Sequence, residues 1–252
     1  MNQERRNLII DILKSRGTIT NEEIIKRFNI SVETVRRDLS YLEGQGLLER
    51  VYGGAILKRH SASEPEYKKR ELENSEEKNA IAKNAESLIK SEEAIFFDLG
   101  TTVQMIAEKL DTKKKIHAFT NSLRTAISLS EKDCDVFIPG GFLRKGEFSV
   151  SGNITEENMK NFNIDKAFIG VGGITEEGIT DFITAEASLR TQIIKNSKTV
   201  IAVADYSKFG IRSMCNICGI KDIDILITDS KAPKKTIDFI KKQGVHVIIV
   251  NI

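Results

Sequence analysis

The sequence predicts an α/β protein in two parts: a small N-terminal domain of helices and a β-hairpin, then a larger domain of alternating strands and helices. Two observations carry this prediction. Between residues 5 and 42, apolar residues recur at spacings of three and four, which is typical of amphipathic helices. From residue 94 onward, short apolar runs alternate with helical patterns, as in a sheet covered by helices on both faces.

Composition indicates a folded, soluble chain of 252 residues, 40% of them hydrophobic. No apolar run reaches the roughly 18 residues that suggest a membrane span. The first residues are charged rather than apolar, unlike a signal peptide, and three cysteines give no even disulfide framework. We therefore expect a cytoplasmic protein. Residues 1–60 carry a net charge of +3 and the remainder −1, an asymmetry that supports nucleic-acid binding only together with a motif.

The first two helices are expected at residues 5–16 and from Thr20 to residue 28. Gly17 ends the first, and Glu23 follows Thr20 at the spacing of a capping box. A tight turn at Asn29 then leads to a third helix. The inward apolar positions of the first two helices are 8, 9, 12, 13, 24, 25 and 28.

The third helix is the stretch around which the chain is organised. Ser31 is placed to cap it, and Gly44 and Gly46 to end it. Val32, Val35, Leu39 and Leu42 share its inner face, whereas its outward positions are Thr34, Arg36, Arg37 and Ser40.

A glycine turn at Gly53-Gly54 joins two short strands, residues 47–52 and 55–57, and this hairpin completes a winged helix-turn-helix. Adjacent arginines on an exposed helix beside a basic wing suit the major groove of DNA. We expect Thr34 and Arg36 to contact bases, and Arg37, Arg50 and Tyr52 to contact phosphates. A small helical bundle with a solvated basic face explains the apolar positions equally well. It does not explain the arginine pair and the wing together.

Residues 58–77 are mostly charged and are expected to form a linker, which we interpret as a solvated tether. The domains are therefore 1–57 for DNA binding, 58–77 for the linker and 78–252 for an effector domain. In that last domain a first helix begins near residue 78. Strands are expected at 94–97, 116–119, 135–138, 167–171, 199–204, 223–228 and 245–250, with helices at 103–110, 122–130, 154–162, 184–196 and 233–243.

Loops rich in glycine, threonine and serine follow these strands, at the sheet edge where ligands of α/β proteins bind. Nine of the 17 glycines lie between residues 100 and 178. Backbone N–H groups, hydroxyls and helix N-termini together suit a phosphate and a row of hydroxyls, which indicates a sugar phosphate. The candidate effector-binding residues are Asp98, Gly100, Thr101, Thr102, Thr120, Asn121, Gly140, Gly141, Arg144, Gly172, Asp205 and Lys208.

Taken singly, each loop has a simpler interpretation as a turn or a helix cap. The run from Gly170 to Gly173 lacks the third glycine of a dinucleotide fingerprint, because residue 175 is Thr. Cys215 and Cys218 have the spacing of a metal or redox pair, but Cys134 is the only cysteine left to complete a closed zinc site. We expect a structural role for this pair, and neither a metal nor a cofactor.

Two stretches resemble the DeoR family of bacterial transcriptional regulators. The pattern S-x-x-T-x-R-R-D-L-x-x-L-x-x-x-G-x-L-x-R-x-x-G-G-A, from Ser31 to Ala55, is similar to the winged helix-turn-helix of that family, which commonly has His where Tyr52 stands. Residues 78–250 resemble its sensor domain in five motifs: D-x-G-T-T from Asp98, T-N from Thr120, G-G and a following Arg from Gly140, G-V-G-G-I from Gly170, and A-D-x-S-K-F-G from Ala204.

This resemblance implies a C-terminal fold similar to ribose-5-phosphate isomerases, and a phosphorylated sugar as effector. It implies a DNA-binding regulator, which we expect to be a repressor of a sugar-metabolism operon. The implied DNA-binding residues are Ser31, Thr34, Arg36, Arg37, Arg50, Tyr52 and Gly53.

The competing interpretation is an isomerase-like enzyme with a basic N-terminal appendage. Such an enzyme needs a carboxylate base, and the segment from Gly170 to Gly173 that occupies the corresponding place contains none. Asp181, Glu186 and Asp205 are near in sequence, and Asp205 with Lys208 suits a binding pair. We therefore expect no catalysis. A small DNA-binding domain gains affinity when two copies bind the two halves of a repeated site. We therefore expect a homodimer or homotetramer.

Overall fold

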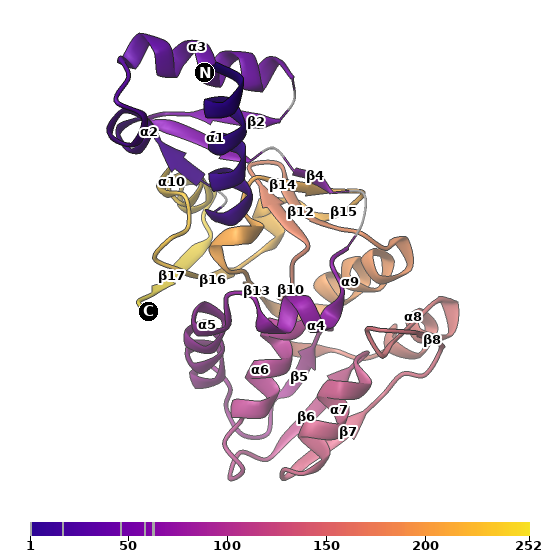
Figure 1. Cartoon of the computed structure of the whole chain (residues 1–252). Helices are drawn as coiled ribbons and strands as arrows, with labels where there is room; N and C mark the ends of the chain where they lie inside the picture. The colour runs from indigo at the N-terminus through magenta and orange to yellow at the C-terminus, as the bar shows by residue number, and fades with distance from the viewer. Residues whose placement is uncertain (1, 17, 46, 58, 62–63) are drawn as a thin grey trace.

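A computed structural model describes residues 2–16, 18–45, 47–57, 59–61 and 64–252, without the side chains of residues 2, 14–16, 57 and 59–61. A small helical domain lies at one end of the molecule and a larger α/β domain at the other (Figure 1). Within the described residues, no helix is long and apolar enough to cross a membrane.

The N-terminal domain contains the three expected helices, α1 (Asn2–Arg16), α2 (Asn21–Phe28) and α3 (Val32–Gly44). The capping box is confirmed: Thr20 Oγ1 accepts from the backbone N–H of Glu23, and the Glu23 carboxylate accepts from the N–H of Thr20. Ser31 caps α3 by accepting from the N–H of Thr34. Asn29 adopts the left-handed conformation that turns the chain between α2 and α3. Gly46, expected at the end of α3, lies outside the described residues.

The wing differs from the expected two-stranded hairpin, because a third strand joins it. The sheet order is β1 (Thr18–Thr20), β3 (Gly54–Leu57) and β2 (Leu48–Val51), all antiparallel. Gly53 has the positive φ of the turn, whereas Gly54 is already in β3. A Cβ on Gly54 would lie 2.1 Å from the carbonyl oxygen of Ile19, so glycine is what lets β1 approach.

Apolar residues from all three helices form the core of this domain, including the buried Ile9, Ile24 and Leu39. Asp38, beside the arginine pair, points inward rather than outward. Its carboxylate accepts from Arg5 Nε at 2.7 Å and from Arg6 Nε at 2.8 Å. These bonds tie α1 to α3 and fix which face of α3 remains exposed.

The larger domain is built on a seven-stranded sheet in which every neighbouring pair is parallel. This confirms the predicted α/β architecture, and each expected strand is present with its ends shifted by at most a few residues. In spatial order the strands are β17 (His246–Val250), β16 (Ile225–Asp229), β13 (Ser197–Val203), β10 (Ile164–Gly170), β5 (Ala94–Phe97), β6 (Ile116–Thr120) and β7 (Cys134–Phe137).

Helices cover both faces of the sheet, because neighbouring strand residues such as Phe96 and Phe97 are buried on opposite sides. One face is covered by α5 (Ser75–Ser87), α6 (Thr101–Lys109) and α7 (Leu123–Ser130). The other is covered by α8 (Asn153–Met159), α9 (Thr184–Asn196) and α10 (Lys234–Lys242).

Short strands that the sequence did not predict form separate small sheets. One contains β11 (Gly173–Thr175), β12 (Gly178–Asp181) and β15 (Cys215–Cys218), and another pairs β8 (Phe142–Arg144) with β9 (Ser149–Ser151). At three or four residues, each is too short for its alternation to stand out from the surrounding loop.

The segment between the domains is not the solvated tether that we expected. Its strand β4 (Arg59–Ser61) pairs in parallel with β14 (Ile211–Ser213), and its helix α4 (Tyr67–Leu72) buries Tyr67 to 6% exposure. Arg124 of α7 stacks over the Tyr67 ring at 4.2 Å. Tertiary contacts of this kind are not visible in a charged, Pro-containing run of sequence.

Candidate functional site

The outward face of α3 lies at the end of the molecule farthest from the large sheet, so it is open to a partner (Figure 1). The Arg36 side chain is 64% exposed and lies 3.9 Å from the Glu33 carboxylate. Arg37 is exposed, with no ion-pair partner in the described part of the chain. Thr34 is half-buried and its hydroxyl lies 3.0 Å from that of Ser31. Two exposed guanidinium groups therefore project from α3, and that of Arg36 has only a long, solvent-exposed contact with Glu33 among the described residues.

The wing adds polar groups beside this face. Arg50 donates to the Ser40 hydroxyl at 2.6 Å, which fixes β2 against α3. Tyr52 is fully exposed at the tip of the wing, next to the positive-φ Gly53. Its ring and hydroxyl are therefore open to a partner.

A second candidate site is a cavity of about 40 Å³ at the carboxyl edge of the parallel sheet. It brings together loops that follow β5, β10 and β13, as the sequence predicted for a ligand. It also includes Glu64 and Arg70 from the inter-domain segment. Six of the predicted effector residues line it: Gly100, Thr101, Thr102, Gly172, Asp205 and Lys208.

The N-terminus of α6 forms one wall of this cavity. Gly100 precedes the helix at φ +115°, and a Cβ there would meet nothing within 4 Å, so its glycine is required by conformation rather than by space. Thr101 and Thr102 begin the helix, whose first N–H groups lack helical partners. Lys208 lies across the cavity and has no ion pair within the described residues. It does not pair with Asp205, which instead accepts from Asn74 Nδ2 at 3.0 Å and the N–H of Ser207 at 3.0 Å.

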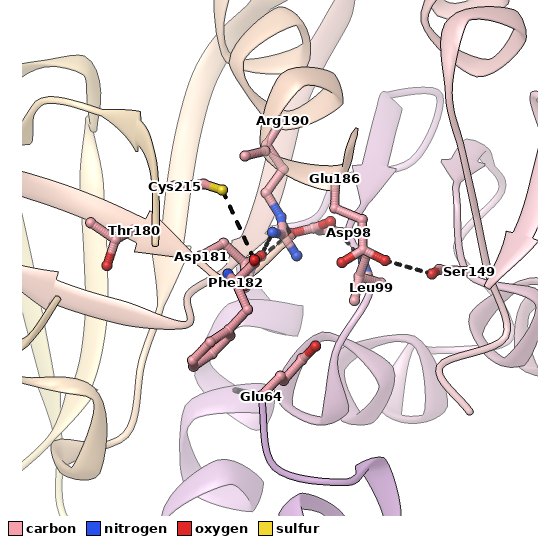
Figure 2. A network of polar contacts seen from close by, with 12 residues as sticks. Glu64, Asp98, Leu99, Ser149, Thr180, Asp181, Phe182, Glu186, Arg190 and Cys215 are labelled. Atoms are coloured by element: carbon pink, nitrogen blue, oxygen red, sulfur yellow. Dashed lines mark hydrogen bonds and ion pairs between the residues drawn. The ribbon is translucent and has the colours of Figure 1, made fainter. Parts of the chain in front are cut away.

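Beneath the cavity, a buried arginine joins two buried aspartates (Figure 2). Arg190 Nε donates to Asp98 Oδ2 at 2.5 Å, and its guanidinium also pairs with Asp181. Asp98 accepts further bonds from the N–H groups of Leu99 and Gly170, at 2.8 and 3.0 Å. Asp98 is thus fully buried and does not itself line the cavity. It joins β5, β10 and α9.

Beside this cluster, Glu186 of α9 accepts from the Ser149 hydroxyl and from Arg144, both at 2.8 Å (Figure 2 shows the Ser149 contact). Burial raises the pKa of Glu186, against the opposing effect of Arg144. Arg144 also donates to Glu64 at 2.6 Å, so it connects the effector domain to the segment between the domains.

Four other predicted effector residues lie outside the cavity. Thr120 accepts from the N–H of Ser122 at 3.0 Å. The Asn121 amide is fully buried, and neither its nitrogen nor its oxygen has a partner among the described residues. Gly140 and Gly141 have positive φ and lie against α8, where Thr155 Oγ1 donates to the Gly140 carbonyl at 2.6 Å. Their part in effector binding stays a prediction.

Sequence reasoning did not assign Arg190, Glu186 or Glu64 to the site. Glu186 and Arg190 are four residues apart on α9, and the other buried residues of this helix are all apolar. Charges on such a helix are a usable signal, because they stay buried only when paired. Nothing in the sequence distinguishes Glu64 as a site residue, since it lies in a run of many charged residues.

Cys215 and Cys218 lie at the two ends of β15, and both are free thiols. Burial raises the pKa of Cys218 to about 12, which leaves it protonated and unreactive at neutral pH. Among the described residues, no group of three or more His, Cys, Asp or Glu side chains is placed to hold a metal ion.

Comparison with known proteins assigns both parts of the chain. Residues 5–60 match the DeoR-like helix-turn-helix domain, and residues 73–230 match the DeoR C terminal sensor domain. The chain is 36% identical to the HTH-type transcriptional repressor GlcR of Bacillus subtilis, over 98% of this chain and 96% of GlcR. It is 34% identical to the glycerol-3-phosphate regulon repressor of Escherichia coli, over 91% of this chain and 92% of that protein.

A third relative is the HTH-type transcriptional regulator GolR of Listeria innocua, 34% identical over 92% of both chains. Among solved structures, ribose 5-phosphate isomerase A of Methanocaldococcus jannaschii is similar over 54% of this chain and 55% of its own, at a TM-score of 0.41 and 15% identity. A similarity that weak does not bear on function.

Proposed function

The chain belongs to the DeoR family of transcriptional regulators, and from that premise we propose that it represses a sugar-metabolism operon under the control of a phosphorylated sugar. Residues 1–57 bind operator DNA, residues 58–77 connect the domains, and residues 78–252 bind the effector. The main support for this proposal is the cavity at the sheet edge, where a helix N-terminus, two threonines and a lysine without an ion pair among the described residues lie together. The protein acts in the cytoplasm.

The DNA part of this proposal is supported by the exposed face of α3. A helix of this width enters the major groove, where Thr34 and Arg36 reach base edges. Arg37, Arg50 and Tyr52 reach phosphates on either side. Ser31 and Gly53 support the contact by fixing the start of α3 and the turn of the wing.

The effector part is supported by the chemistry of the cavity. The free N–H groups at the start of α6 and the Lys208 ammonium attract a phosphate. The hydroxyls of Thr101 and Thr102 and the carboxylate of Asp205 are suited to sugar hydroxyl groups.

Replacing Lys208 with Ala is expected to weaken binding of a phosphorylated sugar by roughly tenfold or more, since a hydrogen bond to a charged group contributes about 1.5–3 kcal/mol. The measurement is a thermal-shift titration with inorganic phosphate and with the phosphates of glycerol, ribose, fructose and glucose. Lys221→Ala, at an exposed position outside the cavity, is the control. Equal thermal shifts for the two variants would show that Lys208 does not bind the effector.

An isomerase needs a carboxylate base that is free to take a proton from the sugar. Of the aspartates that line the cavity, Asp181 is paired with Arg190, and Asp205 accepts two hydrogen bonds. We therefore propose that the chain binds a sugar phosphate without converting it. Turnover of the same panel of phosphates, assayed at high protein concentration, would establish the enzyme alternative.

We also propose that the chain forms a homo-oligomer. Apolar side chains between residues 127 and 154 are unusually exposed: Ile127, Ile138, Phe142, Leu143, Phe148 and Ile154. Phe142 and Leu143 lie on β8 and Ile154 on α8, two elements far from α3, whereas Ile127 lies on α7 (Figure 1). Phe142 is the most exposed of the six, at 77%. Such a patch is typical of a protein interface, and a dimer would present two copies of α3 to paired half-sites.

Phe142→Asp is therefore expected to dissociate the oligomer, because a charge in an apolar interface loses hydration without a partner. Sedimentation velocity measures the change, with Leu72→Asp as the control at a residue 79% exposed on α4. An unchanged sedimentation coefficient for Phe142→Asp would place the interface elsewhere.

A further inference from the structure

Glu64 belongs to the segment between the domains, yet it lies at the effector cavity (Figure 2). One of its carboxylate oxygens accepts from Arg144 at 2.6 Å, and the other lies 3.0 Å from Arg70. Its side chain is only 8% exposed. We propose that Glu64 occupies part of the effector site, and that a phosphorylated sugar binds by displacing it from Arg70 and Arg144. This inference rests on the proposed function.

Glu64 is exchangeable because each arginine has another carboxylate partner. Arg144 also binds Glu186 at 2.8 Å, and Arg70 lies 2.5 Å from Glu147. When Glu64 leaves, neither guanidinium becomes an unpaired buried charge. Each regains donor capacity for an anionic or hydroxyl oxygen, because a guanidinium has five N–H donors. Arg70, which lines the cavity, is thus a further ligand-binding residue, and Arg144, already predicted from the sequence, reaches the ligand once Glu64 has moved.

The size of the cavity supports displacement. A volume of about 40 Å³ holds a few water molecules but not a phosphorylated sugar. Glu64 and Arg70 are the lining residues that come from the segment between the domains, so movement of Glu64 opens the cavity without disturbing the sheet. The walls formed by Gly100 and Gly172 belong to loops anchored on strands.

The path of the chain connects this movement to DNA binding. Glu64 follows β4 by three residues, and β4 follows the wing strand β3 almost directly. The loop beyond Lys208 also approaches the wing, since a Cβ on Gly210 would lie 2.8 Å from Ile56 Cδ1. A ligand that moves Glu64 therefore acts on the segment that leads directly into the wing.

The test compares Glu64→Gln with Glu66→Gln, an exposed neighbour outside the cavity lining. Ligand binding is measured by the thermal-shift titration with inorganic phosphate and the phosphates of glycerol, ribose, fructose and glucose. Operator affinity is measured by fluorescence anisotropy, with and without the best-binding probe.

We expect Glu64→Gln to bind the best probe roughly tenfold more tightly than wild type, because the probe no longer competes with a charged partner of two arginines. Without any probe, its operator affinity should shift in the direction that the probe shifts wild type. Glu66→Gln should match wild type in both assays.

If wild type responds to a probe and Glu64→Gln responds as Glu66→Gln does, the displacement proposal is wrong while the sensor function stands. If wild type responds to no probe, the sensor function fails and this proposal fails with it. Should Glu64→Gln not fold, hydrogen exchange of the wild-type Arg70 amide, which donates to the Glu66 carbonyl at the start of α4, decides. Exchange should accelerate when the best probe is added, and unchanged exchange contradicts displacement.

Discussion

Replacing Arg190 with Met is expected to lower the free energy of unfolding by about 3–5 kcal/mol, the range for breaking one side of a buried ion pair. Arg190 is 3% exposed and is held between Asp98 and Asp181, which are themselves buried. Met has a similar length but no charge, so two buried carboxylates lose the cation that they share. Urea unfolding of the full chain measures the loss.

Two controls separate this effect from the loss of any salt bridge. Arg212→Met removes an arginine that pairs with Glu177 but is 49% exposed, and it should cost less than about 1 kcal/mol. Adding Asp98→Asn and Asp181→Asn to Arg190→Met should recover part of the stability, because the orphaned charges are gone. Equal losses for Arg190→Met and Arg212→Met would show that the buried cluster is not a stabilising unit.

Replacing Arg36 and Arg37 together with Ala is expected to abolish specific operator binding at moderate salt. Arg36, as a base contact, contributes about 1–3 kcal/mol, and the loss of the Arg37 phosphate contact adds to this. Both side chains are exposed and lie outside the packed core of the N-terminal domain, so the variant should fold as wild type does. Fluorescence anisotropy with operator DNA measures the loss, and circular dichroism checks the fold.

The salt dependence distinguishes the roles of the two arginines. Arg37→Ala should reduce the slope of log K against log salt by about 0.9, the value for one phosphate contact, whereas Arg36→Ala should relax base preference. Lys113→Ala with Lys115→Ala is the matched control, since it removes two exposed cations from the loop before β6. An equal loss in this control would mean that net charge, and not α3, determines binding.

The helices and strands that could be predicted from the sequence are those stabilised by interactions between residues close together in the chain. Thr20 and Ser31 cap helices through hydrogen bonds that span only three residues. Strand β5 is recognisable because its four residues are all apolar, and residues 95–97 are buried on both faces of the sheet. Such signals depend on residues that are neighbours in the chain, so they can be recognised in a single sequence.

The features that the sequence missed depend on residues that are far apart in the chain. Arg190 meets Asp98 across 92 positions, and Arg144 meets Glu64 across 80. Strand β1 exists because β3 pairs with it, not because three residues such as Thr18–Thr20 prefer an extended chain. The loops of the sheet edge were predictable as a group, but not which of their side chains would face the cavity.

The central claim is that one chain binds operator DNA and changes that binding when it binds a phosphorylated sugar. The most direct measurement is an anisotropy titration of the full chain on DNA from its own upstream region, with and without the panel of phosphates. We predict specific binding that one phosphate of the panel strengthens or releases. Absence of specific binding even at low salt, where phosphate contacts are strongest, would contradict the account.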